Sequence, residues 1–263
     1  MIKLIATDID GTLLNSKKQV PPGFKEAVDR FYEAGIKFIA ASGRQYFNLL
    51  DLFPGQEHKV TFISENGSLV FEDGINIFHS KIKPEHIKEP LIAARGIKNA
   101  FPVFCGIQNA YVENDDPFLL ENVDMYYKNV KSVSDLSRIS GDIICKIAVF
   151  DKICGEDNSY PALKRFEKYM QVAVSGIHWV DLTEPGINKG SAIRLLQERY
   201  GIKPEECMAF GDYLNDLEMM RSCGYSYAVA NAHGKIKEIC KYQTKSNDEN
   251  GVMEVLDTVL NMV

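Results

Sequence analysis

The stretch DIDGTLLNS, residues 8–16, lies near the amino terminus and directly follows the run KLIAT at 3–7, which is apolar at its centre. Such a run is typical of a buried β-strand, and side chains two positions apart on a strand share a face. Asp8 and Asp10 are therefore expected to point the same way at the end of this strand. Two carboxylates that close repel each other, and a divalent cation would compensate their charge. The alternative is a polar turn, because Asp and Gly are ordinary turn residues.

The composition is that of a globular protein. The chain has 263 residues, of which 45% are hydrophobic and 25% charged, and its formal net charge is −6. This length suits one large domain or two modest ones. No long basic run occurs in the sequence, so neither nucleic acid nor an anionic membrane is expected as a partner.

The cysteines and histidines indicate neither a zinc site nor a set of disulfide bonds. The six cysteines include no CxxC pair, and the five histidines form no HExxH pair. We expect reduced thiols and no zinc site. A secretory leader and an apolar run of membrane-spanning length are both missing from the sequence, so a cytoplasmic location is expected.

Strand and helix patterns alternate in the first and last parts of the chain. The predicted strands are residues 3–7, 37–41, 60–64, 207–210 and 226–229, with a hairpin at 68–71 and 75–79. The predicted helices are residues 22–34, 45–52, 189–200, 216–222, 232–240 and 252–262. This alternation predicts an α/β fold with a doubly wound parallel sheet.

The middle of the chain has a different pattern. It mixes strands such as 143–150 with helices such as 161–169, and polar loops at 113–117 and 155–159 separate them. We interpret residues 83–185 as an inserted α+β domain. Residues 1–82 and 186–263 would then form one α/β domain.

Polar residues follow several of the predicted strands. Asp8 and Asp10 end the first, Ser42-Gly43 follows the second, Glu65-Asn66-Gly67 the third, and Gly211-Asp212 the strand at 207–210. Ligands of open parallel sheets bind beyond the carboxyl ends of the strands, so these residues should converge. Lys189 precedes a helix from which it could reach the same edge.

These residue types suit a phosphoryl group bridged to a metal. Three carboxylates could hold Mg²⁺: Asp8, Asp10 and Asp212. Three groups could hold an anion: the Ser42 hydroxyl, the Gly43 N–H and the Lys189 ammonium. A carboxylate can attack phosphorus and form an aspartyl phosphate, and a second carboxylic acid can protonate the leaving oxygen.

Four motifs resemble those of the haloacid dehalogenase-like (HAD) hydrolase superfamily. They are DIDGTLL at 8–14, ASGR at 41–44, Lys189, and GDYLND at 211–216. ISENGSLV at 63–70 and PGINKG at 185–190 are similar to stretches of its Cof-type phosphatase subfamily. Of the 147 positions that separate Ser42 from Lys189, most belong to the insert, which resembles a class II cap on a HAD-like Rossmannoid core.

The resemblance implies a role for each matched residue. Asp8 would be the nucleophile and a magnesium ligand. Asp10 would be the general acid/base, and its backbone carbonyl would also contact the metal. The phosphoryl group would be bound by three residues: Ser42, Gly43 and Lys189. Asp212 would be a direct magnesium ligand.

Four further residues receive supporting roles from the resemblance. Asn215 would lie near metal and phosphate, and Asp216 would support the metal or orient Lys189. Arg44 would orient the site, and Asn66 would contact the substrate. Asn66-Gly67 is equally well interpreted as a turn.

The expected function is a Mg²⁺-dependent phosphohydrolase acting on a small phosphate ester, with a sugar phosphate implied by the resemblance. A sugar phosphomutase on the same scaffold and a non-catalytic phospho-ligand sensor are the alternatives. An EF-hand-like calcium loop fits poorly, because its sixth and twelfth positions would be Leu13 and Gln19. Tyr213 departs from the small residue common after GD and is expected to narrow the site. In the insert, His178 and Trp179 are expected to pack or to lie at the surface.

Overall fold

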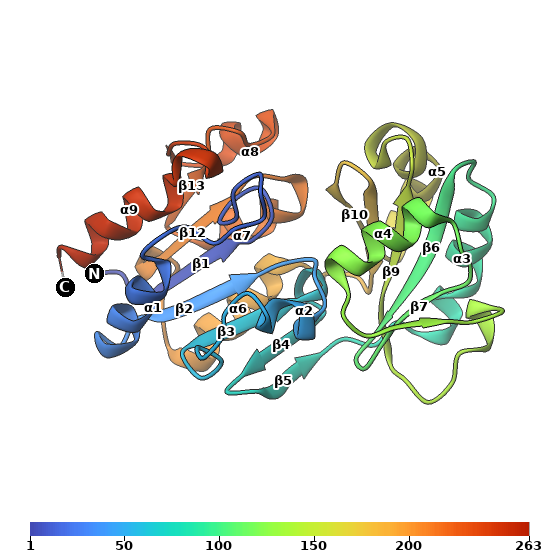
Figure 1. The fold of residues 1–263 in the computed structure, drawn as a ribbon, viewed down its shortest axis with the longest axis horizontal. Helices are drawn as coiled ribbons and strands as arrows, with labels where there is room; N and C mark the ends of the chain where they lie inside the picture. Colours follow the sequence, from blue (N-terminus) through green and yellow to red (C-terminus); the bar gives the residue numbers. More distant parts are fainter. Residues whose placement is uncertain (263) are drawn as a thin grey trace.

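Two β-sheets organise the protein, for which a computed structural model describes residues 1–262. One sheet has eight strands and the other six. Figure 1 shows them in two lobes, with both chain termini at the end of the first lobe that lies away from the second. The first lobe contains the beginning and the end of the chain, and the second contains its middle.

The eight-stranded sheet has the order β14-β13-β12-β1-β2-β3-β4-β5. Its strands are β1 (Leu4–Asp8), β2 (Lys37–Ala41), β3 (Val60–Ser64), β4 (Leu69–Glu72), β5 (Ile75–His79), β12 (Cys207–Gly211), β13 (Tyr225–Ala228) and β14 (Tyr242–Gln243). The strands from β14 to β3 pair in parallel, whereas β4 and β5 form the antiparallel hairpin at one edge. β1 lies inside the sheet and is buried at every position, which explains its continuous apolar run.

Helices cover both faces of this sheet. They are α1 (Phe24–Glu33), α2 (Tyr46–Leu50), α6 (Lys189–Tyr200), α7 (Leu217–Ser222), α8 (Gly234–Ile239) and α9 (Gly251–Leu260). Ile5 of β1 packs in one hydrophobic cluster with α1 and α9, and its neighbours Leu4 and Ala6 pack in another with α6 and α7. Successive strand residues therefore reach opposite helix layers, as in a doubly wound sheet.

The six-stranded sheet has the order β10-β11-β9-β6-β7-β8. Its strands are β6 (Ala100–Gly106), β7 (Ala110–Val112), β8 (Val130–Ser132), β9 (Ile144–Asp151), β10 (Gln171–Gly176) and β11 (Trp179–Thr183). Its helices are α3 (Lys88–Arg95), α4 (Pro117–Tyr126) and α5 (Tyr160–Leu163). All pairs are antiparallel except β7–β8, so the middle of the chain is α+β, as predicted. The boundaries of the two domains stay a prediction.

Most element predictions are confirmed, and two in the middle of the chain are wrong. The helix predicted at 161–169 is α5 followed by a 3₁₀ segment, Lys164–Lys168. The polar loop predicted at 155–159 is a π-helical turn, Gly155–Ser159. Asp151 accepts side-chain hydrogen bonds from two residues of this turn, Asn158 and Ser159. This polar segment can form a helical turn because the buried Asp151 carboxylate accepts hydrogen bonds from its side chains.

Among residues 1–262, no helix combines the length and the apolar character needed to cross a bilayer.

Candidate active site

The strand ends bring the predicted carboxylates and the lysine together. Asp8 pairs in register with Ala41, so that Ser42 follows at the same edge, and β12 lies on the other side of β1. Three carboxylate groups have oxygens within 4.8 Å of one another: those of Asp8, Asp212 and Asp216. The structure therefore places the first and fourth motifs side by side.

Lys189 binds two of these three carboxylates. Its fully buried ammonium donates hydrogen bonds to Asp8 Oδ1 and, at 2.7 Å, to Asp216 Oδ1. α6 begins at this lysine because Asn188 caps the helix, accepting from the Ser191 N–H at 2.9 Å. Gly67 allows the loop after β3 to pack closely against the start of α6, since a Cβ there would lie 2.3 Å from the Asn188 carbonyl oxygen.

Asp216 organises the loop that carries Asp212. While one of its carboxylate oxygens binds Lys189, the other accepts from the backbone N–H groups of Asp212 at 3.0 Å and Tyr213 at 3.2 Å. Asp212 itself accepts at 2.9 Å from the Thr12 hydroxyl. Gly11 has a φ of 80°, and a Cβ there would come within 2.4 Å of Asp212 Oδ2, so glycine is required at this position.

The single positive charge of Lys189 does not balance the carboxylates of Asp8, Asp212 and Asp216. Burial raises the pKa of Asp8 to about 7 although Lys189 lowers it, and the nearby Asp216 raises it further. Burial, followed by the charges of Asp8 and Asp216, raises the pKa of Asp212 well above its ordinary value. Asp8 Oδ2 is buried and has no hydrogen-bond partner within residues 1–262. An orphaned oxygen beside a second carboxylate is a suitable environment for Mg²⁺, which prefers oxygen ligands.

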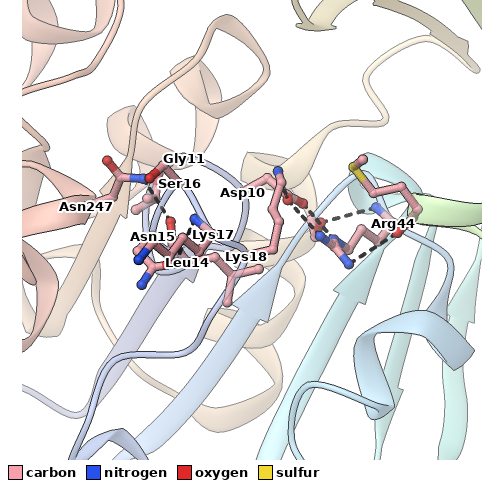
Figure 2. A network of polar contacts seen from close by, with 12 residues as sticks. Asp10, Gly11, Leu14, Asn15, Ser16, Lys17, Lys18, Arg44 and Asn247 are labelled. Carbon is pink, nitrogen blue, oxygen red and sulfur yellow. Dashed lines mark hydrogen bonds and ion pairs between the residues drawn. The ribbon is translucent and has the colours of Figure 1, made fainter. Parts of the chain in front are cut away.

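Asp10 has different surroundings from Asp8. Arg44 binds both of its carboxylate oxygens, at 2.6 and 2.7 Å, and Lys18 binds Oδ1 at 2.8 Å (Figure 2). Burial by itself would raise the pKa of Asp10, but Arg44 and Lys18 hold it below its ordinary value. Arg44 thus holds the Asp10 carboxylate in place, while its role in the reaction stays a prediction. Sequence reasoning missed Lys18, which has no motif of its own.

The loops after β2 and β3 are joined by hydrogen bonds. The Asn66 N–H donates to the Ser42 carbonyl at 3.0 Å, and the Arg44 N–H donates to Ser42 Oγ at 3.2 Å. Asn66 Oδ1 accepts from Asn215 Nδ2 at 2.9 Å, which joins these loops to the loop after β12. Asn66 also has a left-handed backbone with a φ of 55°. It is therefore a turn residue whose side chain joins the loops around the site, and its expected contact with substrate stays a prediction.

A cavity of about 520 Å³ lies over these groups. Its lining from the eight-stranded lobe includes Asp8, Asp10, Ser42, Gly43, Arg44, Asp212, Tyr213 and Asn215. Its lining from the six-stranded lobe includes Tyr126, Tyr127, Lys146, Ile177, His178, Trp179 and Asp181. Residues of both lobes therefore line the same cavity.

The residues from the six-stranded lobe were largely missed from the sequence. Trp179 packs as expected, with its ring centroid 5.0 Å from that of Phe150, but it also lines the cavity with His178. Lys146 and Asp181 match no motif that was recognised. Their position at the cavity depends on how the two lobes dock, and the hydrophobic pattern of a strand does not indicate this.

The family model described as haloacid dehalogenase-like hydrolase matches residues 5–256. The chain is 30% identical to the 5-amino-6-(5-phospho-D-ribitylamino)uracil phosphatase YbjI of Escherichia coli, over 98% of this chain and 96% of that one. It is 26% identical to the Bacillus subtilis phosphatase YwtE, named for the same substrate, over 98% of each chain. The solved structure of SMU.1108c from Streptococcus mutans superposes with a TM-score of 0.92 at 28% identity, covering 99% of this chain and all of that one.

These matches, together with the site, define the class of protein. The chain belongs to the haloacid dehalogenase-like hydrolase family, and it is a phosphatase with the α/β core and cap of that fold. The similarity to Cof-type phosphatases seen in the motifs is confirmed at the same time.

Proposed function

We propose that the protein is a Mg²⁺-dependent phosphohydrolase that releases phosphate from a small metabolite through an aspartyl phosphate on Asp8. One observation carries the proposal: the buried Asp8 carboxylate binds Lys189 through one oxygen, and its other oxygen has no partner in the described part of the chain, beside Asp212 and below a cavity. A carboxylate in this position can act as the nucleophile of a phosphoryl transfer.

The metal would be held by Asp8, the backbone carbonyl of Asp10, and Asp212. When bound, Mg²⁺ supplies positive charge to the phosphoryl oxygens and offsets the carboxylate charges. Lys189 supplies a second positive charge and keeps Asp8 oriented, while Asp216 keeps Lys189 in place. Ser42 and the N–H of Gly43 would bind the remaining phosphoryl oxygens.

Asp10 would transfer protons in both half-reactions. As an acid, it would protonate the departing alcohol while Asp8 attacks phosphorus; as a base, it would then deprotonate the water that hydrolyses the aspartyl phosphate. Its lowered pKa keeps the carboxylate ionised, which is the form that a base requires. The acid role requires that Arg44 or Lys18 moves away from the carboxylate, because both favour its ionised form.

The substrate is proposed from the cavity and from the relatives. A cavity of about 520 Å³ is of the size that accommodates a small metabolite. Its lining combines the polar groups around Asp8 with aromatic side chains of the six-stranded lobe, such as Tyr126 and Trp179. A phosphate ester of a sugar or sugar alcohol, with or without an attached heterocycle, fits this lining, and the relatives are named for such a compound. We place the reaction in the cytoplasm.

The proposal is tested by phosphate release from a panel of phosphorylated metabolites, measured with Mg²⁺ and with a chelator. Release that requires Mg²⁺ is expected, and the ranking of substrates identifies the leaving group. Interconversion of sugar phosphates without free phosphate would instead identify a phosphomutase. Phosphate binding without any turnover would identify a sensor.

A further inference from the structure

A buried group of charges joins the two lobes beside the candidate active site, and the reaction described above does not use it. The group consists of Lys146 on β9, Asp181 on β11, and Glu65 in the loop after β3. The Lys146 ammonium lies 2.7 Å from Glu65 Oε2 and 3.5 Å from Asp181 Oδ2. All three side chains are at least 96% buried.

Such a group needs an explanation, because burying charges is costly and well-packed apolar residues often serve stability equally well. Burial would lower the pKa of Lys146, but Asp181 and Glu65 raise it well above its ordinary value, so the lysine is a cation. Glu65 Oε1 and Asp181 Oδ1 have no hydrogen-bond partner among residues 1–262. The chain therefore holds a positive charge at this point at some cost in stability.

Lys146 also makes a third contact, with the loop after β2. Its ammonium donates to the carbonyl oxygen of Gly43 at 2.9 Å. A trans peptide unit is planar, with its C=O and N–H pointing in opposite directions. Fixing the Gly43 carbonyl therefore fixes the N–H of Arg44, which donates to Ser42 Oγ at 3.2 Å. Because Ser42 Oγ accepts this bond, its own proton is free for another acceptor.

We propose that Lys146 is a positioning residue for phosphate binding: it fixes the peptide plane between Gly43 and Arg44 and thereby directs the Ser42 hydroxyl toward the transferring phosphoryl group. This inference rests on the proposed function. Since Lys146 belongs to the six-stranded lobe and Ser42 to the other, the phosphate site is complete only while the two lobes are docked as in this structure. Asp181 adds to the coupling, because it accepts from Asn66 Nδ2, and Asn66 in turn binds Asn215.

A double-mutant cycle between Lys146→Met and Ser42→Ala tests this directly. Lys146→Met alone would leave two buried carboxylates without a cation, so the cycle is made in a Glu65→Gln background that removes one of them. The measured quantities are the Kd of inorganic phosphate by calorimetry with saturating Mg²⁺, and kcat/KM on the best substrate of the panel. Lys128→Met is the control, because the Lys128 side chain also joins the lobes, through Asp51 at 2.8 Å, and only its backbone N–H, which the substitution keeps, contacts the segment after β2, at Gln45.

With Ser42 present, Lys146→Met should weaken phosphate binding by roughly 10-fold and lower kcat/KM by on the order of 100-fold. With Ser42→Ala already in place, the same change should cost less than about threefold, because both residues act through one hydroxyl. Lys128→Met should leave both quantities unchanged. Lys146→Arg should cause a smaller loss than Lys146→Met, since arginine can also donate to the Gly43 carbonyl.

Two results would overturn the inference: unchanged phosphate affinity in Lys146→Met, or a loss equally large with and without the Ser42 hydroxyl. If hydrolysis by the unmutated protein is intact in either case, the inference alone fails. If the unmutated protein shows neither Mg²⁺-dependent phosphate binding nor hydrolysis, the proposed function fails and the inference fails with it.

Discussion

Lys189 and Asp8 are 181 positions apart in the chain, yet the lysine ammonium donates a hydrogen bond to the aspartate carboxylate at the carboxyl end of β1. The lysine begins a helix, and the aspartate ends the strand inside the sheet. This contact joins the two parts of the core that the inserted lobe separates. It also keeps the proposed nucleophile oriented, so its removal should affect stability and catalysis together.

Lys189→Met should destabilise the metal-free protein by about 3–5 kcal/mol, because Asp8 and Asp216 lose the cation that they share in a buried site. Urea unfolding in the presence of a chelator measures this free energy. Lys3→Met is the control. Lys3 pairs with Glu206 at the surface, and exposed pairs contribute roughly 0–1 kcal/mol. Equal effects of the two substitutions would show that the buried cation has no special role.

Asp10→Asn should separate the two half-reactions. An amide cannot take a proton from water, so hydrolysis of the aspartyl phosphate should become slow, whereas nitrophenolate leaves without a proton. With p-nitrophenyl phosphate, we expect a burst of about one nitrophenol per active site followed by slow turnover. Rapid-mixing absorbance measures the burst. Steady turnover at the unmutated rate would exclude Asp10 as the acid/base.

Mg²⁺ should stabilise the protein in a pH-dependent way. The pKa of Asp8 is raised from 3.8 to about 7 without metal, so the folded form holds its proton more tightly than the unfolded form. Stability of the metal-free protein should therefore fall as pH rises from about 4 to about 7, and the raised pKa of Asp212 adds to this fall. Mg²⁺ offsets this loss, so the Tm difference between Mg²⁺ and chelator should grow over the same interval.

Asp212→Asn is the control for this measurement, because it removes a proposed metal ligand and one of the repelling charges. Its Tm should respond little to Mg²⁺ at any pH. A Mg²⁺ effect on the unmutated protein that is the same at pH 5 and pH 8 would contradict the proposed origin of the stabilisation.

Tyr213→Ala should change which substrates are accepted. Tyr213 lines the cavity, with its ring centroid 5.8 Å from that of His233, so alanine would widen the site. For bulky esters KM should rise by roughly 10-fold, the scale of a lost apolar contact, while acetyl phosphate should react as before. Tyr225→Ala, on the edge-proximal strand β13 and outside this cavity, is the control. A matching loss with acetyl phosphate would show that Tyr213 supports the reacting groups themselves.

The core and its polar edge were predictable because local patterns decide both. Short apolar strands that alternate with helices determine a parallel sheet, and its carboxyl edge then collects Asp8, Ser42 and Asp212. Lys189 was assigned to this edge through its resemblance to the third motif. The Lys189 helix was predicted at its observed bounds, because Asn188 and Gly201 mark its ends in the sequence. The roles of these residues stay predictions until they are measured.

The contacts between lobes could not be predicted in the same way. Lys146 lies in an apolar strand pattern, and only docking against the core shows that its charge meets Glu65 and Gly43. Lys18 follows the first motif in a turn where a solvated lysine would be the default, yet it binds Asp10. Both cases depend on tertiary proximity, which periodicity along the chain does not encode.

The most direct test of the central claim is phosphate release by Asp8→Asn beside the unmutated protein, with the best substrate of the panel and saturating Mg²⁺. The amide keeps the size of the side chain but is a poor nucleophile. We predict that turnover falls by more than about 10⁴-fold, while the fold is retained in circular dichroism. Turnover within tenfold of the unmutated rate would contradict the assignment of Asp8 as the nucleophile and the aspartyl phosphate with it.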